Sequence, residues 1–387
     1  MKKILYIWKD VYPWDIRVQK VCESLAKNGY EVFLLCRWKK GQKKSEIING
    51  INVIRVGFGR PSFMTIPLQF NPIWDNAIEF NIRKIKPNLI IIREILLAIS
   101  AGRFAKKYGI PVIMDMAENY PAAMRDFKKY NQSKFLKYAV HKLKLPDKIE
   151  KTSVALMDGI FVVCDEQIQR LSDNYNFDKK RISVVHNTIT RGVLKPVKTT
   201  KDDKIITILH HGWMSGEKSL TNLIKAFKIT IKSNQNLKLV LAGNGECEDE
   251  YKQLAIEEIK SGKIVFLGKY NYDELQVIIN QCDYGIIPYQ VSDFNNYTIH
   301  NKIFDYFAVG KPVIVSEVAP LKRIMLETNA GIIANCENVE SLSQTLSELS
   351  KNNYDLLSSN AYKSFENKYN WEEDGRVLLN FIHKFID

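Results

Sequence analysis

The hydrophobic residues of this chain form short apolar runs that alternate with longer amphipathic segments. Between several runs, apolar side chains recur at helical spacing, as in Ile16–Asn28 and from about Glu94 to Tyr108. Strands that alternate with helices predict a parallel sheet with both faces covered. In the first half of the chain we expect strands at Lys3–Trp8, Tyr30–Cys36, Ile51–Val56, Asn88–Arg93, Pro111–Asp115, Gly159–Val163 and Ile182–Val185.

The alternation breaks between residues 188 and 204, where charged residues, a glycine and a proline replace the periodic apolar positions. A second series of strands and helices follows this break. We therefore predict a first α/β domain over residues 1–190, a linker over 191–204 and a second α/β domain over 205–368. A C-terminal helix over 369–387 is expected to pack on the first domain. The strands expected in the second domain are Ile205–Leu209, Leu237–Ala242, Ile264–Leu267, Tyr284–Pro288, Pro312–Val315 and Gly331–Ala334.

Length and composition agree with two globular domains and exclude several other classes. The chain has 387 residues, of which 45% are hydrophobic and 26% charged, so it can bury two cores and is not disordered. No apolar run reaches the roughly 18 residues that favour a membrane-spanning helix. The short apolar run after Lys2 and Lys3 is typical of a first strand and not of a signal peptide. We expect a cytoplasmic protein.

The cysteine content and the net charge say less about the fold and the function of the chain. The six cysteines are scattered without a CxxC pair or a Cys/His cluster, which favours small buried side chains over metal ligands or disulfides. The net charge of +13 is compatible with nucleic acid, an anionic membrane or a phosphorylated substrate. No metal site is expected.

The stretch that follows the fourth strand of the second domain carries the most chemistry. Polar residues His300 and Asn301 open a helix that Gly310 ends. A helix N-terminus offers free N–H groups to a diphosphate, and Lys302 adds a full positive charge. Asp305, in the first turn, is placed to accept hydrogen bonds from the two hydroxyls of a ribose. An ordinary capped amphipathic helix would show the same pattern.

Two glycine turns follow strands of the second domain. In the first, Gly212 and Gly216 permit a close approach of the backbone to a ligand, and Lys218 can reach a phosphate. The histidines before this turn could be structural or catalytic. The second turn, Gly243-Asn244-Gly245, lacks the third glycine of a dinucleotide fingerprint, and the chain contains no Walker-type phosphate loop.

These motifs, in this order, resemble the nucleotide-sugar domain of family-4 retaining glycosyltransferases, which have the GT-B fold of two doubly wound α/β domains with a cleft between them. The N-terminal half also resembles that family, through Asp15-Ile16-Arg17-Val18 before a helix, Asp115-Met116-Ala117-Glu118 and Val185-His186-Asn187. The resemblance covers nearly the whole chain. The matching segments of the C-terminal half are His211–Lys218, Lys238–Glu246, Val265–Gly268, Asp283–Tyr289 and Asn301–Val313.

The resemblance implies transfer of a sugar from a UDP- or GDP-sugar, with retention at the anomeric carbon and without a bound metal or other cofactor. Cationic side chains and a helix N-terminus would stabilise the leaving diphosphate. Catalytic roles are implied for Lys218, Glu118, Asp15 and Arg17. Donor-binding roles are implied for Gly212, Trp213, Lys218, Gly243, Leu267, Tyr289, Asn301, Lys302 and Asp305.

The sequence departs from the family pattern at three positions. Tyr297 stands where the family often has the first of two glutamates, so Asp293, Asn295, Asn296 or Thr298 is expected to hold the donor sugar. Trp213 replaces an arginine, and Ala117 replaces a histidine of the first domain. Glu118 is then the remaining polar group of that motif, although it could instead cap the helix near Pro121.

The acceptor side is marked by a basic amphipathic segment, Arg125–Lys151, whose lysines include Lys134, Lys137 and Lys142. Such a segment suits docking on an anionic inner leaflet and hence a lipid-linked acceptor. A solvated helix that packs on its own domain would look the same.

The sequence as a whole favours a glycosyltransferase that acts on a saccharide or lipid-linked acceptor in the synthesis of a cell-surface polysaccharide, such as lipopolysaccharide or capsule. Two alternatives stay open. A sugar-nucleotide epimerase or hydrolase of the same fold would need acids and histidines at the sugar. A basic nucleic-acid-binding or scaffold protein is permitted by the charge, but no nucleic-acid motif is present and no nucleic-acid partner is expected.

Overall fold

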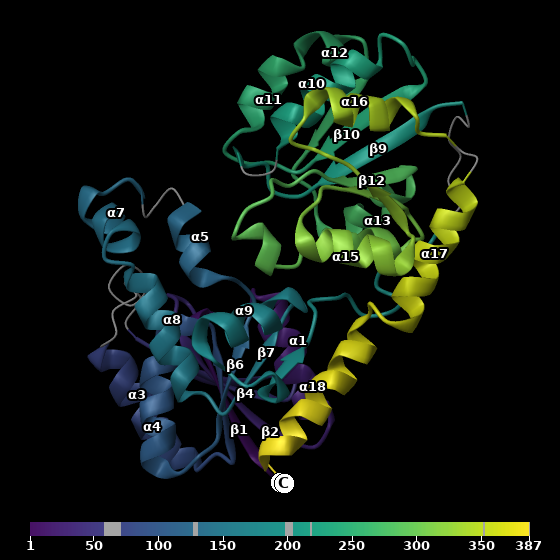
Figure 1. Cartoon of the computed structure of the whole chain (residues 1–387). Helices are drawn as coiled ribbons and strands as arrows, with labels where there is room; N and C mark the ends of the chain where they lie inside the picture. Colours follow the sequence, from purple (N-terminus) through teal and green to yellow (C-terminus); the bar gives the residue numbers. More distant parts are fainter. Residues whose placement is uncertain (58–70, 127–130, 198–203, 217–218, 351–352, 387) are drawn as a thin grey trace. The chain divides into compact units, whose positions relative to one another are not determined.

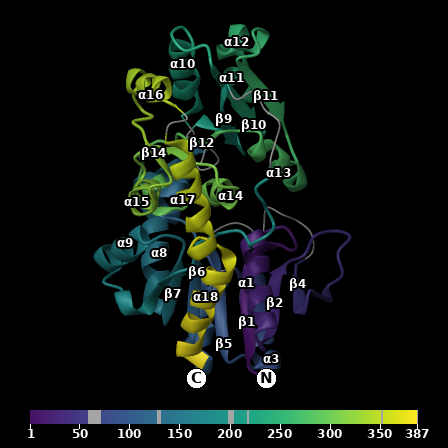
Figure 2. The ribbon, with the colours of Figure 1, turned by 90° about the vertical axis from the view of Figure 1, so that its right-hand side faces the viewer.

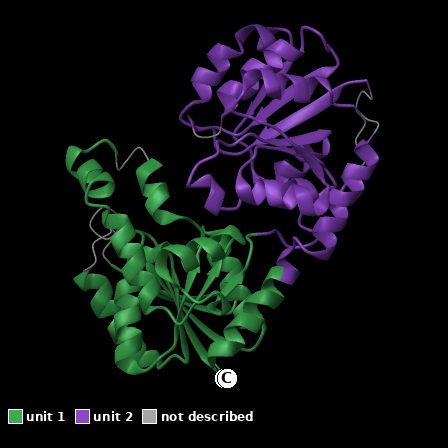
Figure 3. Cartoon of the chain, viewed as in Figure 1, with its two compact units in different colours: residues 1–187, 374–387 green, residues 188–373 purple. Residues whose placement is uncertain are grey.

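The chain folds into two compact units (Figure 3). The computed structural model describes residues 1–57, 71–126, 131–197, 204–216, 219–350 and 353–386. Unit 1 comprises residues 1–187 and 374–387, and unit 2 comprises residues 188–373. Part of the segment predicted as a linker, residues 198–203, lies outside the described residues.

Unit 1 is built on an eight-stranded sheet in the order β3-β4-β2-β1-β5-β6-β7-β8 (Figure 1). The sheet is parallel except for its first pair, and the order reverses at β1, which pairs with β2 on one side and β5 on the other. Buried apolar strands of this kind are typical of a sheet covered on both faces. The strands are β1 Lys3–Val11, β2 Glu31–Arg37, β3 Ser45–Ile48, β4 Ile51–Val56, β5 Leu89–Arg93, β6 Val112–Met116, β7 Gly159–Val162 and β8 Ile182–Val184.

The prediction of a wholly parallel sheet is wrong at one edge, where β3 runs antiparallel to β4. A hairpin joins them through Asn49 and Gly50, which both have positive φ, at 51° and 79°. Asn-Gly is the residue pair that such two-residue turns prefer. The strand escaped prediction because Ser45–Ile48 is short and alternates exposed with half-buried positions instead of forming an apolar run.

Helices cover both faces of this sheet. A large apolar cluster joins alternate strand residues such as Leu5 and Ile7 to α3, α4, α8 and α9. On the other face, the apolar stripe of α1, with Val18, Val21 and Leu25, is fully buried. The helices of unit 1 are α1 Ile16–Lys27, α3 Pro72–Ile85, α4 Ala98–Tyr108, α5 Tyr120–Asp126, α7 Lys134–His141, α8 Leu145–Leu156 and α9 Glu166–Tyr175.

Unit 2 has a six-stranded, wholly parallel sheet in the order β11-β10-β9-β12-β13-β14. Helices α10, α11, α12 and α16 lie on one side of it, and α13 and α15 lie on the other (Figure 1). The strands are β9 Ile206–His211, β10 Leu237–Ala242, β11 Ile264–Gly268, β12 Tyr284–Ile287, β13 Val313–Val315 and β14 Gly331–Ile333. The helices are α10 Leu220–Thr230, α11 Glu248–Leu254, α12 Ile256–Lys260, α13 Tyr272–Asn280, α14 Lys302–Ala308, α15 Ala319–Thr328, α16 Val339–Ser347 and α17 Tyr354–Asn367.

The last helix, α18 Trp371–Ile386, passes from unit 2 into unit 1 (Figure 2). Its Phe381 ring lies edge-on to Phe161 of β7, with ring centroids 6.4 Å apart. A side chain added at Gly159 would meet the rings of Phe381 and Phe385. The C-terminal half of α18 therefore packs directly against the sheet of unit 1.

A buried carboxylate, Asp115 at the end of β6, connects four elements of unit 1. It accepts hydrogen bonds from Tyr6 of β1 at 2.7 Å and from the Arg17 guanidinium of α1 at 2.7 Å. Arg93 of β5 lies 3.4 Å from it. Arg17 also donates to the carbonyl oxygen of Val185 at 3.0 Å, which ties α1 to the end of β8. The two arginines thus neutralise a carboxylate that has no access to solvent.

We predict that Asp115→Ala destabilises unit 1 by about 3–5 kcal/mol, because it leaves two arginine charges buried with less compensation. Urea unfolding followed by circular dichroism measures this loss. Asp147→Ala is the matched control, since Asp147 pairs with Arg125 in a part-exposed ion pair and should cost only about 0–1 kcal/mol. Equal costs for the two variants would contradict the structural importance of Asp115.

Candidate functional site

The loops after β9, β10 and β11 of unit 2 come into direct backbone contact. Gly212 and Gly243 have φ values of 112° and 125°. A Cβ atom at Gly243 would lie 2.0 Å from the carbonyl oxygen of Gly212, and the Gly243 amide donates to Gly268 at 2.7 Å. Side chains at these positions would push the loops apart. The glycines are therefore required by the way the loops meet at the carboxyl edge of the sheet.

Lys302, the first residue of α14, lies against the same backbone. A Cβ atom at Gly212 would be 2.9 Å from its Nζ, which also donates a hydrogen bond to the Tyr289 hydroxyl. The ammonium group is 5.1 Å from the centre of the Tyr289 ring. Three residues predicted to bind the donor, Gly212, Tyr289 and Lys302, are thus brought together from three separate segments.

Asp305, one turn further along α14, takes part in a network of aromatic side chains. It is only 8% exposed, and its Oδ2 lies 3.8 Å from Nε2 of His211. His211 in turn pairs through Nδ1 with the Tyr270 hydroxyl at 3.0 Å. Burial and the charge of Lys302 hold the pKa of His211 well below its usual value, so the imidazole is neutral at physiological pH.

Tyr270 and Tyr272 are members of this network that the sequence did not single out. Burial, and then the charge of Asp305, raise the pKa of both phenols, and Tyr272 also forms a hydrogen bond with Asp305. The signal that could have found them is their place directly after β11, at the carboxyl end of a parallel strand.

Three other predicted donor residues, Trp213, Leu267 and Asn301, lie at or near this edge. Trp213 and Leu267 are 55% and 45% exposed, which leaves two large apolar surfaces open at the ends of β9 and β11. Asn301 precedes α14 and makes no side-chain capping bond there. Lys218 lies outside the described residues, so its predicted role is carried by the resemblance alone.

The predicted catalytic residues of unit 1 have different environments. Asp15 caps α1, where its carboxylate accepts from the amides of Arg17 at 2.9 Å and Val18 at 3.0 Å. Arg17 is buried and donates to Asp115, which gives it a structural contact, and the catalytic role implied for it stays a prediction. Glu118 is half-buried, and the cap of α5 is Asn119, whose side chain accepts from Ala122.

The basic segment forms a surface with exposed apolar side chains. In α7, Phe135 is 76% and Tyr138 is 56% exposed, next to Lys134 and Lys137. Lys142 follows the helix and is exposed as well. We call Lys134–Lys142 the α7 surface. Within the part of the chain that the structure describes, no helix is both long and apolar enough to cross a bilayer.

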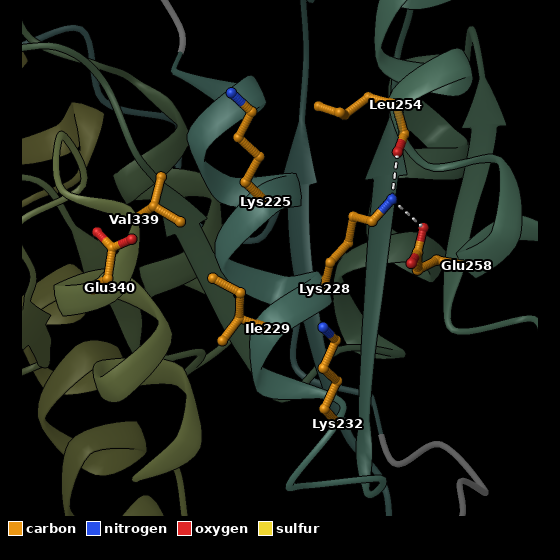
Figure 4. A pocket seen from close by; sticks show the side chains of 8 residues that line it. All are labelled: Lys225, Lys228, Ile229, Lys232, Leu254, Glu258, Val339 and Glu340. Atoms are coloured by element: carbon orange, nitrogen blue, oxygen red, sulfur yellow. Dashed lines mark hydrogen bonds and ion pairs between the residues drawn. The ribbon is translucent and has the colours of Figure 1, made fainter.

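A groove of about 450 Å³ lies on the helical face of unit 2, between α10, α12 and α16 (Figure 4). Lys225, Lys228 and Lys232 line it from α10. Lys228 is held by the Leu254 carbonyl at 2.8 Å and by Glu258 at 3.2 Å. The lining also carries the carboxylates of Glu258 and Glu340, which offset two of its three lysine charges.

The cysteines and acidic residues offer no metal centre in the described ranges. All six cysteines are free, and five are buried. No group of three or more His, Cys, Asp or Glu among the described residues could hold a metal ion.

Comparison with known proteins identifies the class. Two family descriptions match, "Glycosyl transferases group 1" over residues 194–368 and "Glycosyltransferase Family 4" over residues 16–191. Sucrose-phosphate synthase from Thermosynechococcus elongatus has a similar structure, with a TM-score of 0.75, 15% identity and 99% of each chain covered. The protein is therefore a glycosyltransferase with the GT-B fold. It belongs to glycosyltransferase family 4, which confirms the resemblance found in the sequence.

Two further relatives are informative. An uncharacterized glycosyltransferase of Methanocaldococcus jannaschii is 29% identical over 183 residues, which are 46% of this chain and 44% of that protein. HepE of Anabaena, solved in complex with UDP, matches with a TM-score of 0.71 and 11% identity over 99% of this chain and 100% of its own.

We predict that Gly243→Ala weakens nucleotide binding at the carboxyl edge of unit 2, because its Cβ would force the Gly212 loop away from Lys302. UDP binding measured by calorimetry should weaken about tenfold or more, the ratio for a lost bond to a charged group. Gly262→Ala is the matched control, since Gly262 also has a positive φ but precedes β11, and a Cβ there has no neighbour within 4 Å. Unchanged UDP affinity in Gly243→Ala would show that nucleotide does not bind at this edge.

Proposed function

We propose that the protein is a retaining glycosyltransferase that moves a hexosyl group from a nucleoside-diphosphate sugar to a saccharide or lipid-linked saccharide. The observation that carries the proposal is the position of Lys302, whose ammonium group lies against the glycine backbone that joins the ends of β9 and β10. A diphosphate needs a fixed cation, and Lys302 supplies one at this edge. UDP, which HepE binds, is the first nucleotide to test.

In this proposal the reaction is driven by stabilisation of the leaving diphosphate. The C–O bond between the anomeric carbon and the diphosphate breaks, and the acceptor hydroxyl oxygen forms a new bond to that carbon on the same face. The hydroxyl proton passes to the departing diphosphate, and Lys302 stabilises the negative charge that remains on the phosphate oxygens. Lys218 supplies a second cation. Asp305 accepts hydrogen bonds from the ribose hydroxyls. These bonds partly replace the hydrogen bond between Asp305 and Tyr272. The neutral His211 does not compete with Lys302 for negative charge.

We further propose that this chemistry proceeds without a bound metal, since the two lysines supply the positive charge that a divalent cation would otherwise bring. Transfer that persists at full rate in EDTA would support this part of the proposal, and loss of transfer that Mg²⁺ or Mn²⁺ restores would refute it.

The donor assignment is tested by thermal unfolding against UDP- and GDP-sugars. We expect one nucleotide to stabilise the protein, by about 2.7 kcal/mol when it is present at 100 times its Kd. Lys302→Ala and Lys218→Ala should each lower kcat about 10²- to 10³-fold, because each removes charge stabilisation of the leaving group. Asp305→Ala should mainly raise the Kd for the nucleotide.

Lys225→Ala is the matched control, because Lys225 is exposed on α10 and lines the groove on the helical face. Near-normal turnover in Lys302→Ala, or an equal loss in Lys225→Ala, would contradict the assignment. Incubation with donor alone separates transfer from the alternatives, since epimerised sugar nucleotide would indicate an epimerase.

For the acceptor side, we propose that the α7 surface docks on the anionic inner face of the cytoplasmic membrane, where lipid-linked acceptors of lipopolysaccharide or capsule synthesis reside. Exposed Phe135 and Tyr138 beside lysines combine the two forces of such docking, apolar insertion and attraction to anionic headgroups. Solvation of the same helix in a protein without membrane contact would leave these aromatic rings in water.

We predict that the triple variant with Lys134, Lys137 and Lys142 changed to Ala binds vesicles of phosphatidylglycerol and phosphatidylcholine roughly 100-fold less well than the unmodified protein. Each lysine near an anionic surface contributes about 1 kcal/mol. Vesicle sedimentation measures the partition coefficient.

The control removes the same charge from unit 2, by changing the exposed Lys225, Lys232 and Lys363 to Ala. It should bind vesicles nearly as well as the unmodified protein. Equal binding by both triple variants would refute docking through the α7 surface.

A further inference from the structure

Glu94 directly follows β5, at the carboxyl end of the strand that borders the reversal of strand order in unit 1. In open α/β sheets, ligands bind outside the carboxyl ends of the strands at such a reversal. Glu94 is nonetheless only 5% exposed. A carboxyl group is almost never buried to this extent unless it is paired or has a function.

The backbone at Glu94 has an unusual conformation, with φ 65° and ψ 174°. This region is essentially restricted to glycine, so a residue with a Cβ is strained there. The surrounding bonds hold it in place. Its amide donates to the Asp115 carbonyl at 3.0 Å, and its Oε1 accepts from the Ala117 amide at 3.2 Å and from Arg93 at 2.8 Å. The chain thus has a glutamate at a position where glycine would be under less backbone strain.

Three polar atoms around this position have no hydrogen-bond partner among the described residues, although all three are buried. They are Oε2 of Glu94, Nε of Arg93 and Nε1 of Trp8. Trp8 belongs to β1, the other strand at the reversal, and the Arg93 guanidinium lies 5.9 Å from its ring centre. Buried polar atoms are rarely left without a partner, so a cluster of three indicates a place where another polar molecule binds.

The charge state of Glu94 indicates which kind of molecule. Burial raises its pKa to about 8; the charge of Arg93 opposes this shift, and the charges of Glu118 and Asp115 add to it. Tyr6 and Arg17 bind Asp115 from β1 and α1, and Arg93 stays ionised beside it. At neutral pH, Glu94 is therefore a carboxylic acid that can both donate and accept a hydrogen bond.

We propose that Glu94 and Trp8 form a subsite for a hydroxyl group of the acceptor saccharide, and that Glu94 determines specificity for that acceptor. The inference rests on the proposed glycosyl transfer and adds a named acceptor contact to it. A sugar hydroxyl both donates and accepts, which matches the carboxylic acid together with the indole N–H. Oε2 is buried, so acceptor binding includes a side-chain rearrangement at this edge.

The test measures transfer to octyl β-glucoside and octyl β-galactoside, with the UDP- or GDP-sugar that the donor panel selects. Glu94→Ala should raise the KM for the octyl glycoside about tenfold or more, the ratio expected when a buried partner is lost, with the donor KM unchanged. Glu94→Gln keeps a neutral donor and acceptor group and should stay within about threefold of the unmodified enzyme at pH 7.

The pH profile separates this role from a structural one. In the unmodified enzyme, the acceptor KM should increase as pH rises through about 8, because ionised Glu94 loses the proton that it donates. Glu94→Gln should abolish this increase, because an amide does not titrate. A Glu94→Gln variant whose acceptor KM still rises across the same pH range would overturn the inference.

A second variant uses the strained backbone. Glu94→Gly relieves the positive φ, so it should melt at a higher temperature than Glu94→Ala while its acceptor KM stays raised. If the acceptor KM of Glu94→Gly is normal, Glu94 does not contact the acceptor.

Trp8→Phe removes the indole N–H alone and should also raise the acceptor KM. Trp74→Phe is its matched control, since Trp74 is fully buried in the apolar cluster of unit 1. An equal effect of both Trp variants would overturn the subsite, as would failure of both octyl glycosides to accept sugar while a nucleotide still stabilises the protein. Loss of nucleotide stabilisation would instead refute the proposed function itself.

Discussion

The arrangement of unit 1 depends on how it neutralises Asp115. This carboxylate has no solvent access, so it persists only because Arg17, Arg93 and Tyr6 surround it. Those partners come from α1, β5 and β1, so one buried charge sets the positions of a helix and three strands. It also sets the chemistry at the sheet's edge, because the residue after Arg93 is Glu94, whose amide donates to the carbonyl of Asp115.

Unit 2 also has a polar edge on a parallel sheet. There the edge depends on glycines, which have no side chains, and not on a buried charge. Gly212 and Gly243 let two loops touch, and a side chain at Gly212 would also collide with the end of Lys302. A cation fixed at this edge suits the binding of a diphosphate. Burial lowers the pKa of His211 and raises the pKa of Tyr270, so both side chains are uncharged at physiological pH.

The sequence predicted most of these strands, and what it missed has a physical cause. Strands buried on both faces appear as apolar runs, so β9 to β14 were all found. The strand β3 was missed because it is exposed at an edge. The catalytic role implied for Arg17 stays a prediction, and the tertiary structure adds that its guanidinium is buried against Asp115 and the Val185 carbonyl.

What the sequence by itself determined was the class of protein, since apolar periodicity sets the parallel sheets and the spaced motifs identify family 4. Only the tertiary structure decided which polar residues face each other. Burial and partners depend on segments far apart in the chain, as for Tyr270 with His211. Glu94 shows the limit most clearly, because its strained φ and its unpartnered oxygen arise from the meeting of β1, β5 and β6, which no local pattern records.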